Sequence, residues 1–158
     1  MSVTQDILQS WRRPRVVIRR HLARGVSEPW AFSLLAGFVV LSTVAQAPGL
    51  ARAAYLQPEV PMVQRLVAMA LAGMAMIPVW YLMAALSHLV ARAFGGRGGF
   101  YGARLALFWA LLSAVPAVLL QGLVAGLIGP GVQLNVVYVA TGAGFLWLWF
   151  SMLSEAER

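Results

Sequence analysis

Four long apolar stretches, separated by short segments rich in glycine, proline or arginine, constrain this chain more than any other feature. They cover roughly residues 30–47, 63–93, 104–128 and 132–153. A helix needs about 20 apolar residues to cross a hydrocarbon core of ~30 Å. Hydrophobic residues make up 61% of the 158 residues and charged residues only 11%, and no stretch alternates as a barrel strand does. We therefore predict an all-α membrane protein, a bundle of four transmembrane helices preceded by an N-terminal amphipathic interfacial helix.

Prolines and glycines set the expected limits of the spans. Pro48 and the glycine after it predict the end of the first span, followed by a loop over residues 49–61. The second stretch has no turn signal, so we expect one tilted or protruding helix, bent near Pro78. Pro116 lies near the middle of the third span. Residues 154–158 form a polar cytoplasmic tail in this scheme.

Residues 1–29 read as a basic, amphipathic segment on the cytoplasmic side of the membrane. Ser2 and Gln5 have the spacing of a capping box, and Pro14 suits the first turn of a second short helix. Val3, Ile7, Leu8 and Trp11 share one helical face, and Val17, Ile18 and Leu22 form a second apolar strip. We expect the segment to lie in the headgroup plane, with an unstructured basic tail as the alternative. The residues expected at the lipid interface are Trp11, Arg12, Arg13, Arg15, Arg19 and Arg20.

The net charge of +7 comes from arginine alone, because the chain has no lysine. Arginines cluster in the N-terminal segment and around Arg97, whereas the loop over residues 49–61 has one and the turn at Gly129 has none. The positive-inside rule then places both termini in the cytoplasm. The apolar core begins too late for a cleavable signal peptide, and an organellar presequence is the minority alternative. We expect a multi-pass protein of the bacterial inner membrane.

The side chains that carry chemistry are few. There is no cysteine, and the five acids (Asp6, Glu28, Glu59, Glu155, Glu157) all lie outside the predicted spans. We therefore expect no enzyme, no cofactor and no metal site. His88, near the cytoplasmic end of the second span, is a candidate polar site as a proton carrier or ligand. Because no carboxylate lies in the spans to pair with it, a hydrogen bond to a neighbouring helix is the favoured interpretation. We expect His21 to be interfacial.

The segment GGRGG at residues 95–99 connects the second and third spans. It lacks the lysine and hydroxyl of a P-loop, so a flexible hinge is favoured over a phosphate cradle. An intermediate hypothesis is a lipid headgroup held by Arg97, Arg104 and free backbone amides. The residues expected to form hinges or kinks are Pro78, Gly95, Gly96, Gly98, Gly99 and Pro116.

Small residues recur at four-residue spacing in the last two spans. Gly122 and Gly126 form a GxxxG pattern, and Ala140 and Gly144 repeat it in the fourth span. Small side chains let helix backbones approach closely. We expect this packing within one chain, with a homodimer as the alternative.

The residues FGGRGGFYGARLALFWALLSAVP resemble the bacterial branch of the Yip (Ypt/Rab-interacting protein) domain family, and WRRPRVVIRR is similar to the opening of alphaproteobacterial members. The family tends to show a basic amphipathic N-terminus, a glycine-rich turn after a long helix, and a following helix with a mid-span proline. Its eukaryotic members are linked to Rab GTPases and vesicle traffic, and the bacterial branch implies no settled function. The family is usually described with five spans, whereas this sequence predicts four.

The absence of site chemistry and the arginine-rich N-terminus favour a non-enzymatic membrane protein that organises lipids or a partner complex. Its expected partners are membrane lipids, mainly anionic, with a membrane-protein partner or a homodimer as further options and no nucleic acid. The first alternative is a small accessory subunit of a bioenergetic or secretion complex. The second is a small transporter, channel or lipid scramblase with Pro78 and Pro116 bending helices around a path.

Overall fold

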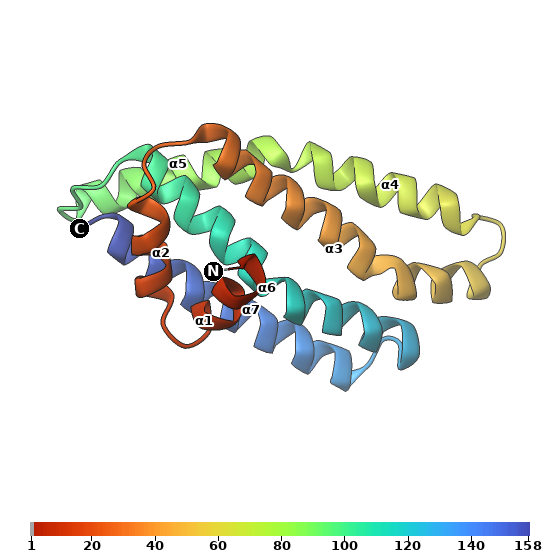
Figure 1. The fold of residues 1–158 in the computed structure, drawn as a ribbon. Coiled ribbons are helices and arrows are strands. Elements are labelled where there is room, and N and C mark those ends of the chain that lie inside the picture. Colours follow the sequence, from red (N-terminus) through yellow and green to blue (C-terminus); the bar gives the residue numbers. More distant parts are fainter. Residues whose placement is uncertain (1) are drawn as a thin grey trace.

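The computed structural model describes residues 2–158, and Figure 1 shows their helices. Two short helices at the N-terminus form a hairpin, which we call the N-terminal hairpin, and five longer helices follow. The bounds are α1 Val3–Ser10, α2 Pro14–Leu22, α3 Glu28–Leu56, α4 Met62–Ala75, α5 Ile77–Ala93, α6 Phe100–Leu127 and α7 Val132–Ala156. By length and apolar composition, four segments can cross a membrane: Glu28–Leu56, Met62–Ala93, Phe100–Leu127 and Val132–Ala156.

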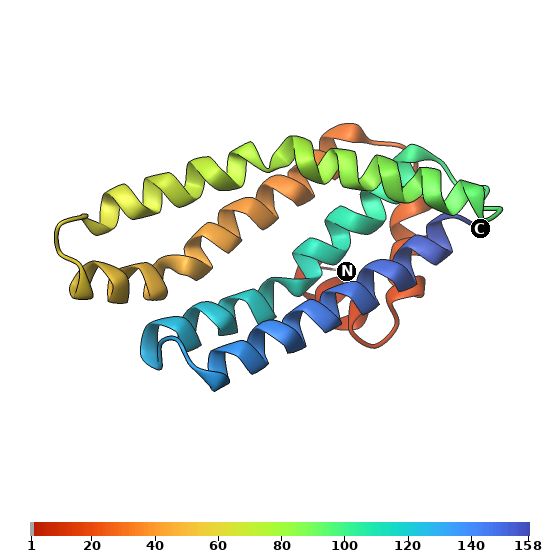
Figure 2. The same cartoon turned by 180° about the vertical axis from the view of Figure 1, so that it is seen from behind.

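Helix α6 is the centre of the bundle. Its first half is buried almost without interruption from Gly102 to Val115, because α3, α5, α7 and the N-terminal hairpin all pack on it. The N-terminal hairpin, the loop over residues 94–99 and the C-terminus gather at one end of the bundle, and the α3–α4 and α6–α7 connections lie at the other (Figures 1 and 2). We call the first of these the arginine-rich end.

The first span is longer than predicted, because Pro48 does not end it. Helix α3 continues through Pro48 to Leu56, and the loop is confined to residues 57–61. A proline removes one backbone donor and its ring crowds the preceding turn. Here the turn around Pro48 is packed closely against Gly126 of α6, and Arg52 one turn later donates to the Gly126 carbonyl oxygen (3.4 Å). Tertiary packing therefore carries the helix past its proline.

The second apolar stretch is interrupted where the sequence predicts a bend. Helix α4 ends at Ala75, Met76 forms a turn, and α5 begins with Pro78 in its first turn. Proline is tolerated there because that position needs no intrahelical donor. None of the residues of α4 is buried, so this half of the stretch leaves its apolar side chains uncovered.

The residues predicted as a polar tail, 154–158, belong mostly to the last helix. Helix α7 continues to Ala156, and the Glu157 side chain that follows is buried. Pro116 in α6 does not interrupt that helix.

The N-terminal hairpin follows the predicted boundaries, and α1 turns a polar face toward the bundle. The Ser2 and Gln5 capping box is present, and Pro14 starts α2. Val17 and Ile18 of α2 are fully buried. In α1, however, the buried residues are Asp6 and Ser10, whereas Leu8 is 70% exposed. Polar contacts to α2 and α6, described below, decide which face of α1 turns inward.

Candidate functional site

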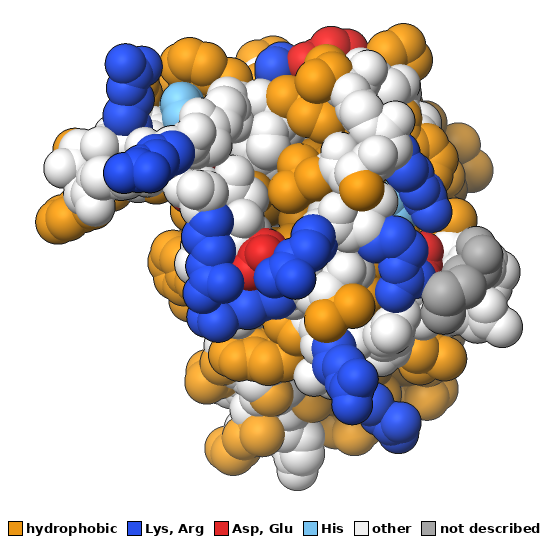
Figure 3. Space-filling model, turned by 60° about the vertical axis from the view of Figure 1, so that its left-hand side comes forward, with side chains coloured by type: hydrophobic (Ala, Val, Ile, Leu, Met, Phe, Trp, Pro, Cys, Tyr) orange, Lys and Arg blue, Asp and Glu red, His pale blue; other side chains and the backbone are white. Residues whose placement is uncertain are grey.

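Arginine side chains gather at the arginine-rich end (Figure 3). All arginines except Arg52 and Arg65 belong to the hairpin and its linker to α3, the end of α5, the 94–99 loop, the start of α6 or the residue after Glu157. Arg65 donates to the carbonyl oxygens of Val60 and Gln57 in the loop at the opposite end (both 3.1 Å). Three arrangements at the arginine-rich end hold polar side chains: a buried network in the hairpin, a buried hydrogen-bonded pair beneath the 94–99 loop, and an exposed groove.

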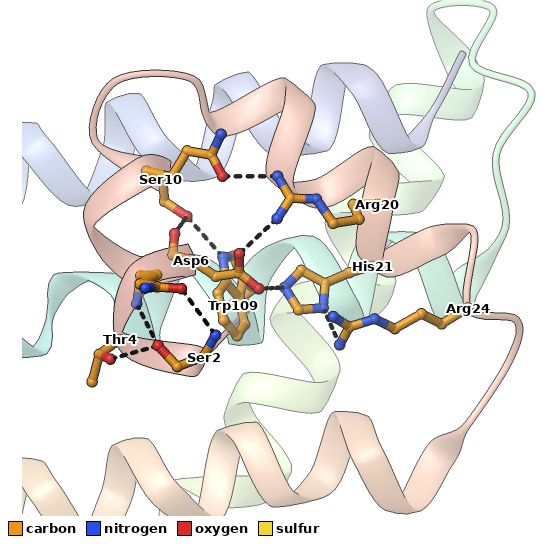
Figure 4. A network of polar contacts seen from close by, with 10 residues as sticks. Ser2, Thr4, Asp6, Ser10, Arg20, His21, Arg24 and Trp109 are labelled. Atoms are coloured by element: carbon orange, nitrogen blue, oxygen red, sulfur yellow. Dashed lines mark hydrogen bonds and ion pairs between the residues drawn. The ribbon is translucent and has the colours of Figure 1, made fainter.

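The buried network joins α1, α2 and α6 (Figure 4). The Asp6 carboxylate, 2% exposed, accepts a hydrogen bond from Arg20 Nη1 (2.7 Å), and Arg20 Nη2 donates to Gln9. Ser10 Oγ donates to the Asp6 carbonyl oxygen (2.8 Å) and accepts from Trp109 Nε1 of α6 (2.9 Å). These contacts leave few polar groups of the hairpin without a partner, so the hairpin docks as an ordered unit.

His21 lies inside this network, contrary to its predicted interfacial position. Its side chain is buried, and its ring packs at a tilt of 42° against the Trp109 ring, with centroids 4.1 Å apart. Arg24 Nη1 lies 3.3 Å from His21 Nδ1; because arginine only donates, Nδ1 accepts and the proton of the neutral ring sits on Nε2, which faces Asp6 Oδ2 at 3.7 Å. Burial, helped by Arg24 and opposed by Asp6, lowers the pKa of His21 to about 4.

Acidification is expected to weaken the docking of the hairpin. In the undocked chain His21 has an ordinary pKa near 6.5, so below that pH the undocked state binds a proton that the docked state excludes. Stability is therefore complete above pH 6.5 and declines as the pH falls toward 4, by about 2 kcal/mol at pH 5. Hydrogen–deuterium exchange of residues 3–22, expressed as protection factors at each pH, measures this decline. A His21→Gln variant should lose the pH dependence between 6.5 and 5; an unchanged profile would assign it to another group.

A second buried pair joins α5 to the end of α7. His88 Nδ1 donates to Glu157 Oε1 (2.8 Å), and both side chains are at most 5% exposed. The Phe100 ring lies 4.4 Å from the His88 ring, centroid to centroid. The sequence-based argument that His88 lacks a carboxylate partner is therefore wrong: the partner comes from the residue after the fourth span, 69 positions away.

The glycine loop closes over Glu157. Gly95 has a positive φ of 91°, which glycine adopts without strain, and the Arg97 amide donates to the Glu157 carbonyl oxygen (2.7 Å). A Cβ at Gly98 would overlap the Ala156 carbonyl oxygen, and one at Gly96 would lie 3.1 Å from Glu157 Oε2. The glycines therefore leave space for the end of α7. That carboxylate oxygen is buried and has no hydrogen-bond partner among residues 2–158.

The structure separates the predicted lipid-facing residues into two groups. Arg19 pairs with Glu155 (2.6 Å) and Arg20 with Asp6, while Arg104 pairs with Glu28 (2.7 Å) and lies over the Tyr81 ring. These arginines hold elements of the protein together. The other group has exposed side chains for which no partner is seen within residues 2–158: Arg12, Arg13, Arg15 and Arg97.

Trp11 is engaged inside the protein rather than free as a membrane anchor. Its indole donates to the Ser113 carbonyl oxygen of α6 (2.9 Å), and its ring occupies the space beside Gly144, where a Cβ would lie 2.7 Å from it. Ala140, predicted as a packing residue, is exposed. Within residues 2–158, no three acidic or histidine side chains come together as a metal site requires.

The comparison with protein families covers nearly the whole chain: the model of the Yip1 domain matches residues 8–156. The chain belongs to the Yip1 domain family. Searches of curated proteins and of solved structures gave no match. The matched region includes the long apolar helices, so this Yip1 domain has the character of a membrane protein.

The exposed groove of this Yip1 domain lies between its hairpin and α7. It has a volume of about 400 Å³ and is lined by Arg12, Arg13 and Arg15 on one side and by Trp147 and Ser151 of α7 on the other. Arg12 and Arg13 also line a neighbouring groove along α1, of about 540 Å³. We call the groove between the hairpin and α7 the arginine groove. Sequence reasoning identified its arginines but not that Trp147 and Ser151 lie opposite them, because nothing local indicates that α7 lies beside α2.

Proposed function

We propose that this Yip1 domain is a non-enzymatic membrane protein that binds anionic lipids at the arginine groove. The observation that supports this most directly is that three exposed arginines, for which residues 2–158 supply no carboxylate partner, line one side of a groove whose other wall carries Trp147 and the Ser151 hydroxyl. Guanidinium groups bind phosphate oxygens through paired hydrogen bonds, and an exposed indole suits the boundary between headgroups and acyl chains. The groove therefore has the chemistry for a lipid phosphate with its chain directed along α7.

The distribution of arginine supports a cytoplasmic arginine-rich end. The opposite end has only Arg52 and Arg65, and the hydrogen bonds of both are made to carbonyl oxygens nearby. Under the positive-inside rule, the end with the excess faces the cytoplasm, where anionic lipids attract basic segments by about 1 kcal/mol per arginine. Both termini then lie on the cytoplasmic side of a bacterial inner membrane.

Replacing Arg12 and Arg13 with glutamine is expected to weaken anionic-lipid binding by about 2 kcal/mol, or roughly thirtyfold. Native mass spectrometry of protein titrated with phosphatidylglycerol in detergent measures the loss. The matched control is Arg92→Gln with Arg97→Gln, which removes the same charge from the same end but outside the groove.

The control should bind like the unmodified chain. Equal losses in both double variants would mean that net charge, rather than the groove, attracts the lipid. A stoichiometric second protein that remains bound after gentle extraction would instead favour the accessory-subunit hypothesis.

A further inference from the structure

The tip of the N-terminal hairpin lies at mid-length of a membrane-spanning helix. Trp11 at this tip bonds to Ser113, which lies thirteen residues after Phe100 and fourteen before Leu127, the two ends of α6. At 1.5 Å per residue, Ser113 is therefore ~20 Å from either end of α6. Arg12 and Arg13 follow directly at the tip. A hydrocarbon core ~30 Å thick, if it enclosed most of α6, would extend past the level of these arginines toward the arginine-rich end.

At the same level, α5 turns an apolar face outward, and Arg104 lies beside that face, over the Tyr81 ring. The Tyr81 ring of α5 lies 5.0 Å from the Phe108 ring, and the next residue of α6, Trp109, bonds to Ser10 of the hairpin. Tyr81 and Ser10 therefore mark one level of the bundle on two sides of α6. Beside Tyr81, Leu82 is 59% exposed, and Leu86 and Leu89 continue the apolar surface toward the arginine-rich end.

A flat bilayer surface cannot match both the arginines on the hairpin side and the exposed leucines on the α5 side. If the headgroups lie at the level of Arg12 and Arg13 all around the protein, the exposed leucines of α5 stand in water, which is unfavourable. If the headgroups lie above those leucines, the arginines enter hydrocarbon, which a membrane relieves by local thinning and by letting water and headgroups in. Bilayers adapt their thickness to the apolar surface of a protein at modest cost.

We infer that the N-terminal hairpin locally thins the leaflet beside it, so that the protein deforms the membrane asymmetrically. On the α5 side, acyl chains cover Leu82, Leu86 and Leu89. On the hairpin side, the headgroup layer descends toward Arg12, Arg13 and Arg15. The inference rests on the proposed function in one respect only: it assumes that these arginines contact lipid headgroups.

Two spin-labelled variants test the inference, and the absence of cysteine makes single-site labelling direct. Leu8→Cys places a label on the hairpin, between Asp6 and Ser10, and Leu82→Cys places one beside Tyr81. Both positions are exposed. In bilayers of phosphatidylcholine alone, collision rates with dissolved oxygen and with a water-soluble nickel chelate report the depth of each label.

The Leu82→Cys label is expected at acyl-chain depth, favouring oxygen, and the Leu8→Cys label at headgroup depth or in water, favouring the chelate. The expected offset is on the order of 10 Å within a leaflet ~15 Å deep. Equal depths for the two labels would overturn the inference. Both labels would lie in water if this end of the bundle protrudes from the membrane, and both would lie in hydrocarbon if the membrane is flat and covers this end. The depth measurement uses no anionic lipid, so its outcome does not depend on whether the arginine groove selects anionic lipids. Each of the two proposals can therefore be refuted without refuting the other.

Discussion

Replacing Gly122 with alanine is expected to destabilise the protein by about 3 kcal/mol, because the added Cβ overlaps the backbone of α3. At this position a Cβ would collide with the Ala45 carbonyl oxygen and lie 2.7 Å from its carbonyl carbon. Backbone atoms do not rotate away as a side chain does, so α3 and α6 must separate along their contact. At Gly126, one turn later, a Cβ would meet Pro48 at 2.5 Å, so the GxxxG pattern packs within the chain.

The matched control is Gly142→Ala on α7, where no atom lies within 4 Å of the added Cβ. Alanine is favoured over glycine in a helix by up to about 1 kcal/mol, so this variant should be neutral or slightly more stable. Thermal unfolding in detergent compares the two variants. If both shift the unfolding temperature equally, the contact between Gly122 and Ala45 is not what holds α3 on α6.

Removing His88 alone is expected to cost about 3–5 kcal/mol, because it leaves the buried Glu157 carboxylate without its partner. The change His88→Ala should also expose the backbone amides of residues 94–99 to hydrogen exchange, since the Arg97 amide depends on the position of Glu157. Removing both side chains should cost less than the sum of the two single changes, because no buried polar group is then left without its partner. A double-mutant cycle measures this coupling from the unfolding free energies of the unmodified protein, the two single variants and the double variant.

Glu59→Ala is the control for this cycle. Glu59 is exposed in the loop between α3 and α4, so its removal should change the stability by no more than about 0.5 kcal/mol. Additive costs for His88→Ala and Glu157→Ala would contradict a coupled pair. Unaltered exchange in residues 94–99 would show that the glycine loop closes without Glu157.

The N-terminal hairpin shows where local patterns suffice and where they fail. Its capping box and the start of α2 at Pro14 depend on residues only a few positions apart, and both were predicted. Its polar inward face was not predicted, because the sequence pattern assigns the apolar face with Leu8 to the membrane and gives no sign of the network around Asp6 and Trp109. A hydrogen-bond network that joins three helices takes only one or two residues from each, so it produces no periodic pattern in the sequence of any one helix.

The sequence by itself determined the four apolar segments of membrane-spanning length and a bend near Pro78, because backbone groups in hydrocarbon must bond within their own segment. It also determined the excess of arginine near the hairpin and the glycine loop. Only the tertiary structure decided that α3 passes Pro48, that Glu157 reaches His88, and which arginines are paired. Those outcomes depend on side chains that are distant in sequence and meet only when the helices pack, so no local pattern contains them.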